Sequence, residues 1–151
     1  MKAYLVQHGK AIDEKEDPRR PLSKEGIAET KKMAELAAAS GAIKPALIFH
    51  SGKLRAKQTA DIFEKSLNPP KGELELDSIA PLDDILRAIE VITSEPEDIM
   101  IVGHLPHLSK VVSKLVAGDE EKLIAAFRNS GIICVEKQGD GKWLVVPAVS
   151  Y

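Results

Sequence analysis

Short apolar runs alternate with longer segments of helical periodicity along the chain. Because crossover helices bury both faces of a parallel sheet, its strands read as short, nearly continuous apolar runs. Six runs predict strands, at residues 3–6, 46–49, 74–76, 99–102, 132–136 and 142–146. The last two flank Gln138-Gly139-Asp140-Gly141, which predicts a C-terminal β-hairpin. The pattern is typical of an α/β domain with a mostly parallel sheet.

The segments between these strands predict helices. Ser23 is a good cap for a helix that runs to about Ser40, and Gly41 is a good stop. Further helices are expected at residues 54–67, at 82–93 and from Pro106 onward, with a short fifth at 120–127. Helices on both faces of the sheet predict a three-layer αβα sandwich. We expect one domain, residues 1–151.

Composition and charge exclude several classes of protein. The 151 residues are 44% hydrophobic and 29% charged, which is typical of a soluble globular domain. A formal net charge of −2 argues against nucleic acid as a partner, since such binders are usually basic. No apolar stretch is long enough to span a membrane, and the N-terminal run is too short for a signal peptide. We expect a cytoplasmic protein in which the single cysteine, Cys134, is a buried thiol.

Polar and titratable residues follow three of the predicted strands. In an open α/β sheet, ligands bind beyond the carboxyl ends of the strands. The three segments are Gln7-His8-Gly9, His50-Ser51-Gly52-Lys53-Leu54-Arg55 and Gly103-His104-Leu105-Pro106-His107. We therefore expect these segments to form one site.

The residue types in these segments indicate phosphoryl chemistry. Arg55 lies in the first turn of a predicted helix, where free N–H groups and the positive end of the helix dipole favour an anion. A neutral imidazole is a competent nucleophile toward phosphorus, and nearby cations keep it neutral. His8 would attack, while Arg55, His104 and backbone amides hold the phosphoryl oxygens. This chemistry needs neither a metal nor another cofactor.

Four motifs occur along the chain in a fixed order. They are Val6-Gln7-His8-Gly9-Lys10-Ala11, Arg20-Pro21-Leu22-Ser23, His50-Ser51-Gly52-Lys53-Leu54-Arg55-Ala56-Lys57-Gln58-Thr59-Ala60 and Val102-Gly103-His104-Leu105-Pro106. Together they resemble the phosphoglycerate mutase-like histidine phosphatase superfamily, and within it the small bacterial phosphohistidine phosphatases of the SixA type. The resemblance covers essentially the whole chain.

The resemblance implies a fold, an activity and a set of site residues. The fold would be phosphoglycerate mutase-like, and the reaction would pass through a covalent phosphohistidine on His8, with Arg55 and His104 in the phosphate pocket. Ser51 would orient its loop. Further phosphate contacts are expected from the following residues: Gln7, Gly9, Arg20, Ser51 and Leu105.

Gln7 departs from the family pattern, which normally has Arg before the histidine. An amide lacks the charge and the forked donors of a guanidinium, so we expect attenuated activity. We expect Arg20 to restore part of the positive field, and Lys10, Arg19 and Lys53 are also close in sequence. The alternative is a weakly active or non-catalytic module that binds phosphate or a phosphoprotein.

Other polar residues have both a functional and a structural interpretation. His104 and His107 have a spacing seen among metal ligands, but Leu105-Pro106 interrupts the helix face between them, so we expect no metal. We expect His107 either to face solvent or to support the site. His50 is expected either to have only a structural role at the end of its strand or to lie near the pocket. Asp83 and Asp84 would be either a proton donor or first-turn helix residues. The acidic run at residues 13–17 is expected to be a solvated loop.

The length of the loops bears on the substrate. Larger members of the superfamily carry inserted segments over the pocket, and no connection in this chain is long enough for such a lid. An open pocket admits a side chain on another protein, and a protonated imidazole is a good leaving group. We therefore expect a phosphohistidine-bearing protein, such as a histidine phosphotransfer domain, as substrate, with a small phosphate ester as the other possibility. We also expect a monomer.

Overall fold

A six-stranded mixed sheet forms the centre of the computed structural model, in which residues 1–148 are described. The strand order is β3-β2-β4-β1-β5-β6. The strands are β1 (Lys2–Gln7), β2 (Leu47–His50), β3 (Glu73–Glu75), β4 (Ile99–Gly103), β5 (Ile132–Lys137) and β6 (Trp143–Val146). The first four are mutually parallel, whereas β5 runs antiparallel to β1 and pairs with β6 as the predicted hairpin.

The strand register determines where the polar segments meet. β1 pairs with β4 from Ala3 opposite Ile99 to Gln7 opposite Gly103. The two strands therefore end side by side, and the residues that follow them, His8 and His104, leave the sheet at the same edge. His8 N–H donates to the carbonyl of Gly103 at 3.0 Å, which extends this pairing by one residue.

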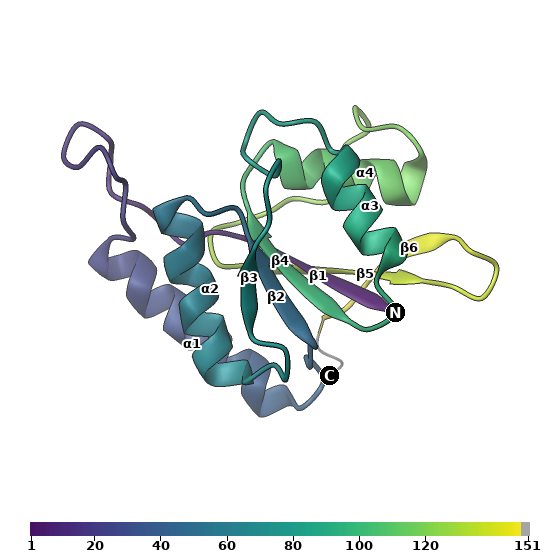
Figure 1. Ribbon diagram of the computed structural model, residues 1–151, viewed down its shortest axis with the longest axis horizontal. Helices are drawn as coiled ribbons and strands as arrows, with labels where there is room; N and C mark the ends of the chain where they lie inside the picture. The colour runs from purple at the N-terminus through teal and green to yellow at the C-terminus, as the bar shows by residue number, and fades with distance from the viewer. Residues whose placement is uncertain (149–151) are drawn as a thin grey trace.

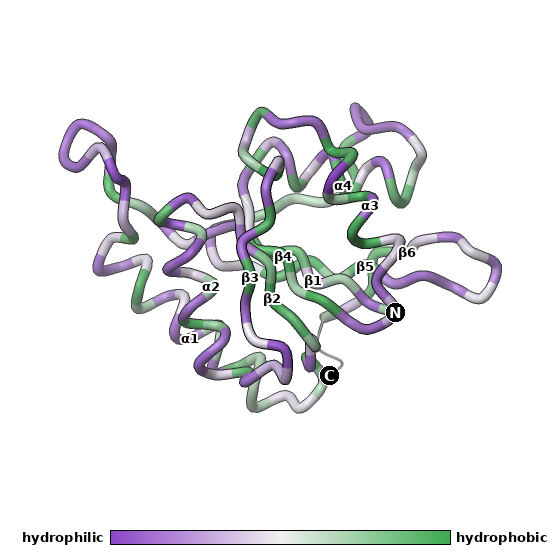
Figure 2. Tube along the Cα trace, viewed as in Figure 1, coloured by the Kyte–Doolittle hydropathy of each residue, from purple (hydrophilic) through white to green (hydrophobic). Residues whose placement is uncertain are grey.

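Four helices cover the sheet, two on each face (Figure 1). They are α1 (Lys24–Ser40), α2 (Leu54–Leu67), α3 (Leu86–Ser94) and α4 (His107–Ala117). Apolar side chains of α1 and α2 pack on one face of the strands, and those of α3 and α4 pack on the other. Figure 2 shows the hydrophobic strands enclosed between helices whose outer sides are hydrophilic. The predicted three-layer αβα sandwich with a C-terminal hairpin is confirmed.

The predicted ends of the first helix are also confirmed. Ser23 accepts a hydrogen bond from the N–H of Gly26 at 2.9 Å, as an N-cap does. Gly41 adopts a left-handed conformation, φ 68°, and closes the last turn through the carbonyl of Ala38. No helix within residues 1–148 is long and apolar enough to cross a membrane.

Two helix predictions are wrong. Helix α3 begins at Leu86 rather than at Leu82, because Asp83 and Asp84 accept hydrogen bonds from backbone N–H groups of Ala80 and Leu86 and hold the preceding residues in turns. Residues 120–127 form turns and irregular backbone, in which Ile124, Ala125 and Phe127 pack against the core while Leu123 is exposed. Tertiary contact overrides the weak helical pattern there.

Candidate active site at the carboxyl ends of the strands

His8 and His104 lie side by side at the carboxyl edge of the sheet. Their ring centroids are 5.1 Å apart and the rings are inclined by 53°. His104 is almost fully buried, with 1% of its surface exposed, and His8 is partly buried. The sequence-based expectation that these residues share one site agrees with this geometry.

The surroundings of His8 determine which of its nitrogens can react. Its Nδ1 lies 2.7 Å from the carbonyl oxygen of Gly9. Because a carbonyl only accepts hydrogen bonds, Nδ1 carries the proton and the lone pair is on Nε2. Burial, followed by the charges of Arg55 and Arg20, lowers the pKa of His8 to about 4 against the opposing effect of the Gly9 hydrogen bond. At neutral pH His8 is therefore a neutral imidazole with a free Nε2, as a nucleophile requires.

His104 is held in place by Ser51. The Nε2 of His104 lies 2.6 Å from the hydroxyl of Ser51, which also accepts the N–H of Lys53 at 3.3 Å. Burial, then the neighbouring charges of His8 and Arg55, lowers the pKa of His104 to about 3. His104 is therefore neutral at the same pH as His8, and Ser51 acts on it as a positioning residue.

Arg55 supplies positive charge at the start of helix α2. Lys53 is the N-cap but makes no side-chain hydrogen bond to the first turn, so amides at this end remain open to a ligand. The Nε of Arg55 is buried and has no hydrogen-bond partner within residues 1–148. Burial, followed by repulsion from the charge of Arg20, lowers the pKa of Arg55. An anion between them would relieve this repulsion.

Arg20 and Gln7 take positions consistent with a phosphate pocket. The Nε of Arg20 donates to the carbonyl of Ile12 at 3.2 Å, and its charge acts on both His8 and Arg55. Gln7 is the last residue of β1, and its buried Oε1 has no hydrogen-bond partner in the described part of the chain. A phosphate contact from either residue stays a prediction.

Gly9 is explained by packing. A Cβ at this position would lie 2.5 Å from the hydroxyl oxygen of Thr30, so no larger residue fits without displacing its neighbours. Its N–H donates to Thr59 at 2.9 Å. That amide is already paired, so Gly9 shapes the loop and does not offer this N–H to a ligand.

Leu105, which follows His104 directly, is 37% exposed at the edge of the site.

Three residues that support the His8 loop escaped the sequence interpretation. The side-chain amide of Asn129 donates to the carbonyl of His8 at 3.0 Å, and the N–H of Ser130 donates to the carbonyl of Gln7 at 2.9 Å. Thr59 accepts the N–H of Gly9. Asn129-Ser130-Gly131 is recognisable only as a turn before a strand, and nothing local indicates that it contacts a segment more than 120 residues away.

His50 and His107 support neighbouring loops. The Nδ1 of His50 accepts the N–H of Gly52 at 3.0 Å, and its Nε2 lies 3.6 Å from Glu73. His107 is buried, with Nε2 3.3 Å from the carbonyl of Asp84, so of its two expected roles facing solvent is wrong and support of the site stays a prediction. Within residues 1–148 no group of three or more His, Cys, Asp or Glu side chains is arranged to hold a metal ion.

The low pKa values of His8 and His104 predict a loss of stability in mild acid. In the unfolded chain both would have a pKa near 6.5, so between about pH 6.5 and 4 the unfolded state binds more protons than the folded state. Falling pH should therefore lower the free energy of unfolding by roughly 1.4 kcal/mol per pH unit for each histidine. Urea unfolding of the protein and of His8→Gln at pH 6 and pH 5 measures this slope. An equal slope in both proteins would contradict the prediction for His8.

Comparison with known proteins identifies the fold. No family model and no curated protein matches the sequence. Among solved structures, the protein histidine phosphatase SixA in complex with tungstate superposes with a TM-score of 0.82 at 24% identity, over 97% of this chain and 94% of that chain. A protein assigned as the phosphohistidine phosphatase SixA of Agrobacterium tumefaciens gives 0.77 at 23% identity, over 97% and 95%. A mycobacterial glucosyl-3-phosphoglycerate phosphatase in complex with VO3 gives 0.75 at 14% identity, over 99% of both chains. The chain therefore has the fold of the phosphoglycerate mutase-like histidine phosphatases, the SixA type among them.

Proposed function

We propose that this protein is a phosphohistidine phosphatase that forms a covalent phosphohistidine intermediate on His8. The observation that carries the proposal is the neutral His8 ring, with Nδ1–H fixed on the Gly9 carbonyl and Nε2 free, next to His104 and within the field of Arg55. The shared fold supports it, because the SixA neighbour holds tungstate, an oxyanion related in shape to phosphate.

The proposed reaction uses these positions. The lone pair of His8 Nε2 attacks the phosphorus and a new N–P bond forms. The bond from phosphorus to the substrate imidazole breaks, and because that ring already carries a proton on its other nitrogen it leaves as a neutral imidazole. Arg55, Arg20 and His104 stabilise the phosphoryl oxygens in the transition state. Water then attacks the phosphorylated His8, which releases inorganic phosphate and restores the neutral ring. No metal is needed in either step.

The size of the loops favours a substrate on another protein. At the carboxyl edge, the connections after β2 and β4 are only a few residues long, and residues 76–85 connect β3 to α3 by turns. No inserted domain covers the pocket within the described chain. A phosphohistidine on a histidine phosphotransfer domain can therefore reach His8, and its imidazole leaves readily enough to need no strong acid.

Rapid quenching tests the covalent step. A histidine phosphotransfer domain phosphorylated with phosphoramidate is mixed with the protein, the reaction is stopped within milliseconds, and the His8 peptide is examined by mass spectrometry under alkaline conditions. We expect phosphate on this peptide at a level that rises and falls with turnover. Turnover without any phosphate on His8 would contradict the covalent mechanism.

The second candidate function is binding without turnover, which Gln7 favours. If the missing guanidinium limits a working catalyst, Gln7→Arg should raise kcat/KM by about tenfold or more, because charge-assisted hydrogen bonds are about twice as strong as neutral ones. Steady-state kinetics with the phosphorylated domain measures the change. Gln7→Lys is the matched control, since it adds charge without the forked donors and should give a smaller gain. Tight phosphate binding with no turnover in any of these proteins would establish the binding module instead.

A further inference from the structure

We propose that the partner docks on two surfaces that flank the pocket, one apolar and one acidic. The apolar surface, the leucine rim, consists of Leu82, Leu86 and Leu105. The acidic surface, the acidic arm, consists of residues 13–17. The occupant is the surface of a protein that carries the phosphohistidine, with apolar residues next to it on one side and basic residues on the other. This inference rests on the proposed function and specifies its partner.

The topology brings both surfaces to the mouth of the pocket. The acidic arm belongs to the connection from β1 to α1, on the face of the sheet that carries α1 and α2. The leucine rim lies on the opposite face, with Leu82 in the connection from β3 to α3, Leu86 at the first residue of α3 and Leu105 in the connection from β4 to α4. Because these strands are parallel, both sets of connections leave the same edge as His8. Figure 1 shows the arm projecting from one side of this edge, across from the turns that precede α3.

The leucine rim is unusually exposed for its residue type. Leu82 is 89% exposed and Leu86 is 71% exposed, and both lie in segments whose backbone is held by side chains. Asp84 links the start of α3 to the start of α4. Its carboxylate accepts the Leu86 N–H, and its carbonyl lies 3.3 Å from His107 Nε2. That contact joins the rim segments of α3 and α4, and Leu105 is the residue directly after His104. The rim therefore lies at the same edge of the sheet as His8.

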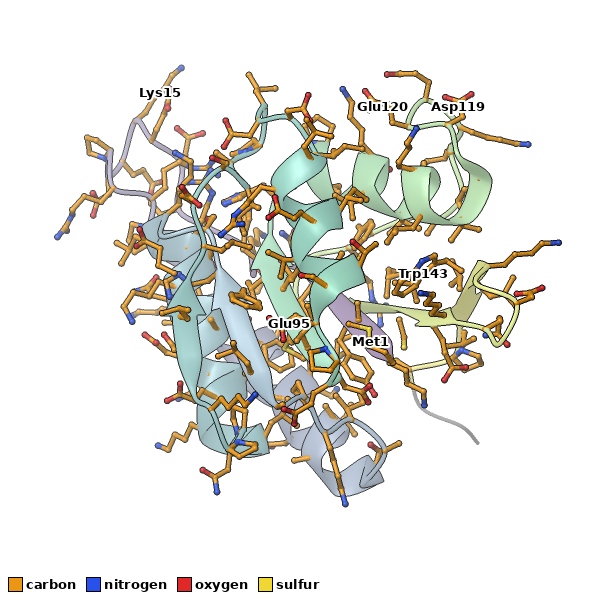
Figure 3. The ribbon with its side chains drawn as sticks, turned by 45° about the vertical axis from the view of Figure 1, so that its right-hand side comes forward. Met1, Lys15, Glu95, Asp119, Glu120 and Trp143 are labelled. Carbon is orange, nitrogen blue, oxygen red and sulfur yellow. The ribbon has the colours of Figure 1, made fainter. Side chains whose placement is uncertain are left out.

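The acidic arm has a fixed base and a charged tip. At the base, Ala11 pairs with Leu22, and the Ile12 N–H donates to the carbonyl of Pro21 at 2.8 Å. Toward the tip, the side chains of residues 13, 14 and 16 are exposed beside the ammonium of Lys15. The fourth carboxylate of the arm, Asp17, pairs with the exposed guanidinium of Arg19 at 2.9 Å. Figure 3 shows Lys15 at the outer end of the arm, away from the body of the protein.

These two surfaces have complementary effects on binding. The arm repels the phosphoryl group and so cannot be part of the phosphate site, but it attracts basic residues on a partner and orients the encounter. Exposed apolar side chains beside a reactive pocket provide the contact area that a protein partner buries and that a small phosphate ester never reaches. Selectivity for a protein substrate therefore depends on these two surfaces and not on the catalytic residues.

Binding and turnover are measured separately to test this proposal. The double variant Leu82→Ser/Leu86→Ser removes the rim without touching the pocket, and Leu144→Ser, 48% exposed on strand β6, is the matched control. Affinity for the phosphorylated phosphotransfer domain is measured by calorimetry in a His8→Ala background, where no turnover occurs. Hydrolysis of p-nitrophenyl phosphate is measured with His8 intact.

The rim variant should bind the phosphorylated domain about tenfold more weakly, while its hydrolysis of p-nitrophenyl phosphate changes by less than about twofold. Leu144→Ser should change neither. Reversing the charge of two residues of the arm in Asp13→Lys/Glu14→Lys should lower the rate of association with the partner and the dependence of that rate on salt. Equal affinity in the parent and rim variant, or no affinity in the parent, would overturn the docking proposal. Binding as expected with no phosphate release from either substrate would instead overturn the proposed enzymatic function.

Discussion

Replacing Arg55 with alanine should lower kcat/KM for the phosphorylated domain by about a thousandfold. Arginines that stabilise a phosphoryl transition state typically contribute 10³–10⁵ in rate. In this site Arg55 has a buried Nε without a partner within residues 1–148 and lies at the open N-terminus of α2. Because Gln7 replaces one expected cation, the remaining charge at Arg55 carries more of the stabilisation. Stopped-flow or steady-state kinetics measures the loss.

Two control variants separate charge from structure. Arg55→Lys keeps the charge but loses the fork, so it should recover only part of the lost activity. Arg20→Ala should lower activity less than Arg55→Ala, because the Nε of Arg20 already donates to the Ile12 carbonyl whereas the buried Nε of Arg55 has no partner within residues 1–148. Arg55→Ala should not lower the free energy of unfolding substantially, since it removes a repulsion from Arg20. A loss of activity below tenfold would show that Arg55 is not a phosphate ligand.

The sequence predicted the sheet and the meeting of His8 with His104 because both depend on strong local signals. Five-residue apolar strands that end in Gly or Gln followed by His place the polar residues at one edge by topology alone. The predictions that depended on weak local signals, such as the start of helix α3, were wrong. Asp83 and Asp84 favour turns as well as a helix start, and the structure uses them as turn acceptors.

The contacts behind the site could not be predicted from one sequence. Asn129 and Ser130 hold the backbone of His8 and Gln7 from more than 120 residues away, and no periodicity encodes such a pairing. Gly9 illustrates the same limit. A glycine beside a catalytic histidine suggests close approach to a ligand, whereas here the close approach is to the hydroxyl of Thr30, and Thr59 holds the amide.

If His8 is the covalent nucleophile as proposed, replacing it with asparagine should lower turnover by at least about 10⁴, because only binding and electrostatic stabilisation remain. Asparagine keeps a polar side chain of similar reach to Nδ1, so the loop and the hydrogen bonds of Asn129 and Ser130 should persist. Affinity for inorganic phosphate should change by only a few fold, since Arg55 and Arg20 remain. Rapid-quench samples of this variant should contain no phosphorylated peptide.

The pH dependence of the unmodified protein provides an independent check on His8. In the proposed mechanism the reactive form is the neutral imidazole, and the pKa of His8 is lowered to about 4, mainly by burial. With p-nitrophenyl phosphate, kcat/KM should therefore be nearly constant from pH 7 to pH 5 and should fall as the pH drops through about 4. A histidine in water would instead lose activity below pH 6.5. A fall centred near pH 6.5 would show that His8 is solvated and protonated before the substrate binds. Arg55 and Arg20 would then not lower the pKa of His8, and their charges would act only on the phosphoryl group.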